Sequence, residues 1–320
     1  MAIKSKVIVH DSDPDALARI KAFLDTNNLI GLRTHTWEVV KTLNENVDLG
    51  AVLLSDSPDA NGVSGIDIAK RVHAIRRELP IFLRRTSKTA DDNLPGDIKD
   101  VISGTYSITD MNELSALIER YLFAQYYPEK LVTGIQEITE EALQSTFKSS
   151  HVMTETPIVV RDQFIYGELF SLISLDSDWC RGYMMIQTDE SAVAEVIRTG
   201  GTWLERTQTD FRHVNSILSE VTNMVWGNVK SKFMRASETK EGVTKAQVPI
   251  IINHARRFVS FGTTNPQLVL RYQVFGAQKQ IEPISIIQKF IFNLNWSPEK
   301  FNEDEKLVDD YLSSGELELL

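Results

Sequence analysis

The chain has 320 residues, which is enough for two domains that each bury a core. Its 34 Lys and Arg against 44 Asp and Glu give a formal net charge of −10, which argues against a non-specific binder of nucleic acid or of an anionic membrane. Cys180 is the single cysteine, so an intramolecular disulfide is excluded and a reducing compartment is favoured. We expect Cys180 to be a small buried hydrophobic residue rather than a nucleophile.

The N-terminal segment shows no sign of an export signal. Residues 1–6 run directly into an apolar strand at 7–10, without the apolar core or the cleavage site of a signal peptide. No apolar run approaches the length of a membrane span. We therefore expect a cytoplasmic protein.

Residues 1–125 alternate short apolar strands with stretches of helical apolar spacing. Strands are expected at 7–10, 51–54, 80–83 and 100–102. Helices are expected at 16–24, 37–43, 65–75 and 111–123. This alternation predicts a parallel sheet with helices on both faces.

Acidic residues follow two of these strands, Asp11 with Asp13 after the first and Asp56 after the next. The order of elements and these acids resemble a two-component receiver domain over residues 6–123. The resemblance implies a flavodoxin-like α/β fold with the acids in the crevice at the strand ends. It places Asp11 in the receiver's metal-binding pair and Asp56 at the phosphate-accepting aspartate. Ser12 stands where the second metal-binding acid would be, and whether Asp13 replaces it stays open.

The receiver pattern is incomplete at other positions too. Arg84 and Arg85 precede Thr86, so a cation displaces the usual threonine or serine, and no Lys-Pro pair follows the strand end expected at 103–106. Because a magnesium site needs several oxygen ligands, these losses should cripple phosphoryl transfer. We interpret residues 1–125 as a degenerate receiver-like domain, a pseudo-receiver in which Asp56 is the candidate phospho-acceptor.

A proline at 128 breaks the helical pattern, so residues 126–130 are expected to form a linker. The second domain is then 131–295, followed by an acidic tail at 296–320. Helices are expected at 131–147 and 190–197, and strands at 157–160, 167–175, 182–187, 248–252, 258–261 and 268–275. Residues 283–295 are expected to pack as an added element. The pattern predicts an α+β domain with helices against a sheet.

A helix that begins near residue 211 carries the clearest functional pattern. At about 100° per residue, Glu220, Asn223, Gly227 and Lys230 fall within an arc of about 80°. The opposite side is expected to be buried and holds Phe211, Val214, Ile217, Leu218, Val221, Met224 and Val225. A glycine in the middle of a helix lowers the stability of the helix by about 1 kcal/mol relative to alanine. Its presence on this polar face favours a surface that a partner approaches closely. The alternative is an ordinary exposed helix face with a tolerated glycine.

The run Glu220-Val-Thr-Asn223-Met-Val-Trp-Gly227-Asn-Val-Lys230 resembles the E-x-x-N-M-x-x-G-x-x-K signature of CheX-type chemotaxis phosphatases, the CheC/CheX/FliY family. The resemblance covers about residues 130–276 and implies a CheX-like α+β fold and a homodimer formed through its sheet. It also implies hydrolysis of the phosphoaspartate of a separate CheY-like receiver. Asn223 would orient the attacking water and Glu220 would dock on the receiver lysine. Gly227 would give clearance, and Lys230 would steer the acidic pocket of the partner.

The chain is expected to need no cofactor of its own, since its six histidines never occur at metal-ligand spacing. The magnesium ion would belong to the partner receiver. Two alternatives to an active phosphatase stay open. One is a non-catalytic dimeric adaptor in two-component signalling, and the other is a first domain that docks on its own signature helix and blocks it. The tail is expected to be either a solvated helix or a partner-binding or autoinhibitory segment.

Overall fold

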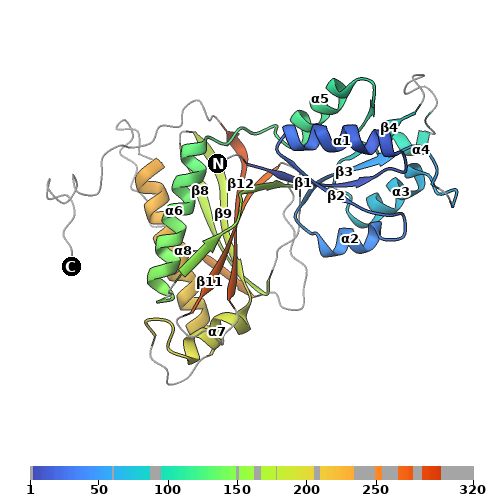
Figure 1. The fold of residues 1–320 in the computed structure, drawn as a ribbon. Coiled ribbons are helices and arrows are strands. Elements are labelled where there is room, and N and C mark those ends of the chain that lie inside the picture. The colour runs from blue at the N-terminus through green and yellow to red at the C-terminus, as the bar shows by residue number, and fades with distance from the viewer. Residues whose placement is uncertain are drawn as a thin grey trace.

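The computed structural model describes residues 3–296, except for 60, 87–93, 95, 149–150, 162–166, 178, 205–209, 234–248, 254–265 and 277–282. These residues form two β-sheets, each covered by helices, that lie beside one another (Figure 1). The strand expected at 258–261 and the acidic tail beyond Trp296 fall outside the described residues. No helix in the described part of the chain has the length and apolar character needed to cross a membrane.

The first sheet is parallel throughout, with strand order β2-β1-β3-β4-β5. Its strands are β1 (Ser5–His10), β2 (Leu29–Arg33), β3 (Leu49–Ser55), β4 (Ile81–Arg85) and β5 (Gly104–Ser107). Its helices are α1 (Pro14–Thr26), α2 (Val39–Glu45), α3 (Gly65–Ile75), α4 (Gly96–Lys99) and α5 (Met111–Tyr121). This strand order is the flavodoxin-like one, so the expected receiver-like α/β fold is confirmed.

The apolar pattern of the sequence explains how this sheet is covered. Every residue of β3 is buried, as a central parallel strand requires. One core cluster joins the sheet to α2 and α3, and a second joins its other face to α1 and α5. The strand expected at 100–102 is wrong, because those residues form a turn and the strand begins at Gly104.

The second sheet is antiparallel, with strand order β10-β8-β9-β12-β11-β6 and with β7 paired to β11. Its strands are β6 (His151–Thr154), β7 (Ile158–Val160), β8 (Leu169–Asp176), β9 (Cys180–Thr188), β10 (Ile250–Asn253), β11 (Gln267–Phe275) and β12 (Ile284–Trp296). Its helices are α6 (Glu129–Thr146), α7 (Glu190–Arg198) and α8 (Phe211–Phe233). The expected α+β class is confirmed. However, the segment at 283–295 is no added element, because β12 is a central strand that pairs with both β9 and β11.

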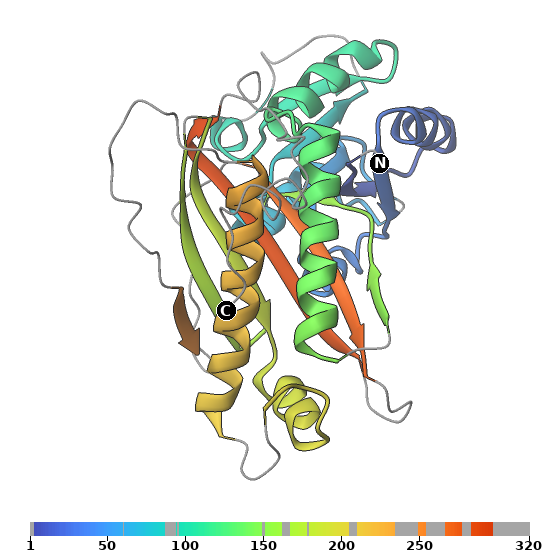
Figure 2. The same cartoon turned by 90° about the vertical axis from the view of Figure 1, so that its left-hand side faces the viewer.

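Helices α6 and α8 lie side by side across one face of the second sheet (Figure 2). They run antiparallel: Gly134 of α6 faces Phe233 at the end of α8, whereas Thr146 near the end of α6 contacts Met224. Helix α8 is also tied to the sheet, because the Thr222 hydroxyl lies 2.5 Å from that of Ser171 on β8. These contacts fix the rotation of α8 about its axis.

Strand β7 connects the two sheets. It pairs with β11, and its backbone also bonds to the start of β1, with Val159 N donating to Lys4 O at 2.9 Å. The Ser5 hydroxyl donates to Val159 O at 2.8 Å. The junction therefore uses the beginnings of the parallel strands, and the acids that follow those strands lie at the opposite end of the first domain.

Candidate functional site

The polar row predicted on α8 is present. Glu220, Asn223 and Gly227 are exposed, and Lys230 is half-buried. The opposite side packs into the core of the second domain through residues that are each at most 7% exposed, namely Val214, Ile217, Leu218, Val221, Thr222, Val225, Trp226, Val229 and Phe233. Figure 1 places α6 and α8 on the side of the second sheet that is turned away from the first domain. In this structure, then, the first domain does not cover the row.

Phe211 departs from the expected pattern, since it is 56% exposed. Its position on the helical wheel is on the buried side, so the exposure comes from its place in the first turn. The Arg212 guanidinium lies 5.8 Å from the centre of the Phe211 ring. The prediction of a buried Phe211 is wrong for this reason.

The two polar side chains at the centre of the row have no partner within the described part of the chain. No hydrogen bond or ion pair from those residues reaches the side chain of Glu220 or Asn223. A Cβ atom added to Gly227 would meet no heavy atom within 4 Å. Packing among the described residues therefore gives no reason for the glycine, and those residues leave both polar groups open to contact with another molecule.

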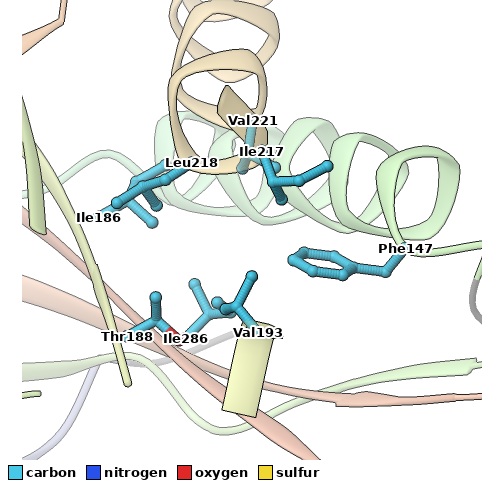
Figure 3. A pocket seen from close by; sticks show the side chains of 8 residues that line it. All are labelled: Phe147, Ile186, Thr188, Val193, Ile217, Leu218, Val221 and Ile286. Atoms are coloured by element: carbon cyan, nitrogen blue, oxygen red, sulfur yellow. The ribbon is translucent and has the colours of Figure 1, made fainter. Parts of the chain in front are cut away.

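A small cavity lies beneath the row, between α8 and the sheet (Figure 3). Its volume is about 10 Å³, and its lining is apolar apart from Thr188, whose hydroxyl donates to Ser285 O at 3.0 Å. The other lining residues are Phe147, Ile186, Val193, Ile217, Leu218, Val221 and Ile286. Apolar cavities of this size stay dry, so this is a packing gap under the helix.

At the acidic end of the first domain, where Asp11, Asp13 and Asp56 follow the strands, arginine side chains pair with the carboxylates. The Arg84 guanidinium donates from Nε to Asp11 Oδ2 at 2.5 Å and from Nη2 to Asp11 Oδ1 at 2.8 Å. Nη2 also donates to Ser55 Oγ at 2.9 Å and lies 3.9 Å from Asp13 Oδ2. Burial lowers the pKa of Arg84, but the hydrogen bonds and the charge of Asp11 outweigh burial and raise the pKa above its usual value. Arg84 is therefore a charged group inside the domain.

Asp56 is held by two other groups at the same end. Arg85 Nε lies 3.0 Å from Asp56 Oδ2, and both the backbone N–H and the hydroxyl of Thr86 donate to Asp56 Oδ1, at 3.1 and 2.9 Å. A cation does reach the phosphate-accepting position, as expected, but it does not exclude the threonine, since Thr86 reaches the same carboxylate from one residue beyond β4. The structure brings Asp11, Asp13 and Asp56 to one end of the sheet as expected. The partners supplied by Arg84 and Arg85 were not predicted, although two cations directly after a buried strand were the available signal.

Cys180 has no role in either site. It is fully buried, and burial raises the pKa of its thiol to about 12. The thiol therefore stays protonated near neutral pH, which makes it a poor nucleophile. The expectation of a small buried hydrophobe is confirmed.

No protein-family model and no curated protein matches the chain. Among solved structures, the chemotaxis protein CheX from Vibrio vulnificus is 18% identical over 50% of this chain and 97% of its own, with a TM-score of 0.35. A CheC-like chemotactic protein from Shewanella oneidensis is 13% identical over 50% of this chain and 96% of its own, with a TM-score of 0.34. A response regulator receiver domain protein from Clostridium thermocellum is 19% identical over 37% of this chain and 93% of its own, with a TM-score of 0.33.

Proposed function

We propose that this chain is a phosphatase that acts on the phosphoaspartate of a separate CheY-like receiver in chemotaxis or two-component signalling. The observation that carries the proposal is the exposed row of Glu220, Asn223 and Gly227 on α8, at the spacing of the CheX-type signature. The described residues leave both polar side chains without an internal partner, and they leave open space over the glycine. Both properties suit a surface that docks on another protein.

The proposed mechanism relies on positioning. An acyl phosphate on a receiver already lies beside that receiver's own Mg²⁺, so the phosphatase has to supply geometry rather than a nucleophile. The Asn223 carboxamide has both a donor and an acceptor, and it would align water with the phosphorus as water-orienting glutamines do in other phosphoryl transfers. Glu220, one turn earlier, would pair with the receiver's lysine and so set Asn223 in register. The chain itself would contribute no cofactor.

The substrate of this mechanism is a second molecule. The row on α8 lies on the far side of the second sheet from the first domain, and the acids of the first domain face away from the junction between the two. Asp56 of the same chain is therefore out of reach of Asn223. Lys230, at the end of the row, would add positive potential for an acidic receiver pocket.

The test mixes the full chain with a phosphorylated receiver from the same organism and follows phosphate release. Asn223→Ala should slow the release by about 100-fold at saturating receiver, because the water loses its orientation. Glu220→Ala should instead raise the half-saturating receiver concentration by about ten-fold or more, because a charge pair at the interface is lost. Asn228→Ala and Glu141→Ala are the matched controls, since they remove an exposed amide from α8 and an exposed carboxylate from α6, both away from the row.

If phosphate release from the available receivers is equally fast with and without the wild-type chain, the proposal that this chain is a phosphatase is contradicted. If the wild-type chain binds the phosphorylated receiver without changing its rate of hydrolysis, the chain is the non-catalytic adaptor instead. Sedimentation velocity on the same samples measures the homodimer that the CheX-type resemblance implies. A wild-type rate in either alanine variant would contradict the role proposed for that residue.

A further inference from the structure

The acidic end of the first domain contains a buried carboxylate, that of Asp11. The Asp11 side chain is 1% exposed, and a buried carboxylate needs a counter-charge or full hydrogen bonding to stay ionised. At the ends of parallel strands, clustered carboxylates are suited to a hard divalent cation, which takes oxygen ligands. Here the counter-charge comes from within the chain.

Both oxygens of Asp11 are already engaged. Oδ2 accepts from Arg84 Nε, and Oδ1 accepts from Arg84 Nη2 and from the backbone N–H of Asp13 at 3.0 Å. This two-point contact between a guanidinium and a carboxylate is the strong, geometrically specific form of the ion pair. A metal ion at this place would have to displace it.

The neighbouring acids are also occupied. One oxygen of Asp13 caps α1 by accepting from the backbone N–H of Asp15 at 3.0 Å and of Ala16 at 3.3 Å. Asp56 is held by Arg85 and Thr86. Within the described residues, no group of three His, Cys, Asp or Glu side chains is arranged to hold a metal ion.

We propose that the Arg84 guanidinium is a permanent internal cation that replaces a divalent metal ion at the acidic end of the first sheet. The position supports this role, because the guanidinium contacts Asp11 and Ser55 within 2.9 Å while its side chain is 3% exposed. The first domain then keeps one arrangement of its acids without a metal. It serves as a fixed structural unit, whereas a receiver that depends on a metal would respond to the supply of that ion.

Mn²⁺ binding by the full chain, followed by electron paramagnetic resonance of the free ion, tests this inference independently of phosphatase activity. The wild-type chain should bind no Mn²⁺ at this end. Arg84→Met fills much of the same space without the charge and should bind one ion per chain. Asp11→Asn added to Arg84→Met should abolish that binding. Arg33→Met removes an exposed cation from β2 and should behave as the wild type does.

Saturable Mn²⁺ binding by the wild-type chain that Asp11→Asn removes would overturn the proposal. So would a folded Arg84→Met variant that binds no ion. If Arg84→Met does not fold alone, Arg84→Gln keeps hydrogen-bonding capacity and takes its place in the same titration. Calorimetry gives a second readout: Mg²⁺ should raise the unfolding temperature of the Arg84 variant by about 3 °C, while KCl of equal ionic strength and the wild-type chain show no such rise.

Discussion

At the scale of single residues, Gly227 separates a structural from a functional explanation of the α8 surface. A Cβ atom there meets nothing within 4 Å, so alanine fits the chain as it stands. Gly227→Ala should therefore stabilise the protein by about 1 kcal/mol through helix propensity, as measured by chemical denaturation. If the glycine gives clearance to a docked receiver, the same variant should lose about ten-fold in kcat/KM for phosphate release.

Asn228→Ala is the control for this prediction, because it alters the neighbouring exposed position on α8 outside the row. It should leave kcat/KM for phosphate release at the wild-type value. A Gly227→Ala variant that is more stable and fully active would show that the glycine is merely tolerated. That result would remove Gly227 from the proposed site and leave Glu220 and Asn223 to be judged by their own variants.

The residues of the α8 row could be predicted from sequence because their relation is local. Glu220, Asn223 and Gly227 lie within two turns of one helix, so a rotation of about 100° per residue is enough to place them together. The pairing of Arg84 with Asp11 is different, since 73 residues separate the partners. Only the assembled sheet sets the end of β4 beside the end of β1, and no local periodicity contains that information.

At the scale of elements, the packing of α6 on α8 depends on a second glycine with the opposite role. A Cβ atom on Gly134 would lie 2.5 Å from Cζ of Phe233, a ring that is only 3% exposed. Gly134→Ala gains about 1 kcal/mol of helix propensity, but overpacking at a buried contact costs about 1–3 kcal/mol. The variant should therefore be less stable than wild type or at best equal to it in chemical denaturation.

The comparison with Gly227→Ala gives this prediction its control, because both variants make the same chemical change in the same domain. Opposite directions of the two stability changes would support the arrangement of α6 and α8. A Gly134→Ala variant that gains as much stability as Gly227→Ala would contradict the close approach of α6 to Phe233.

The helices were better predicted than the strands, and the reason is physical. Helix α3 begins and ends where its apolar spacing predicts, and the structure adds a capping box at Ser64. Strand β2, at the edge of its sheet, was not predicted, since only one of its five residues is fully buried. Strand β12 was read as an added element although it is central, because its place depends on β9 and β11, far away in the sequence.

At the scale of the whole molecule, the two candidate sites lie apart. Helix α8, which carries the row, lies on the side of the second sheet that is turned away from the first domain (Figure 1). The acids paired with Arg84 and Arg85 follow the strands of the first sheet, at the end opposite to the junction. Between them, β7 pairs with β11 of the second sheet and bridges through Ile158 to Lys4, next to β1 of the first sheet. This arrangement argues against the alternative in which the first domain blocks its own signature helix.

Asp48 provides a test of the junction between the two domains. Its buried carboxylate pairs with Lys6 of the first sheet and lies 3.2 Å from Arg271 Nη2 on β11. Asp48→Asn removes the charge that these two cations share, and because both are partly exposed to solvent, the loss should be about 1–3 kcal/mol in thermal unfolding. Asp25→Asn, which removes an exposed carboxylate from α1, should change the stability little.

Since the α8 row faces away from Asp48, phosphate release by the Asp48→Asn variant below its unfolding temperature should keep the wild-type rate. A changed rate in a folded Asp48→Asn variant would mean that the first domain does control the row.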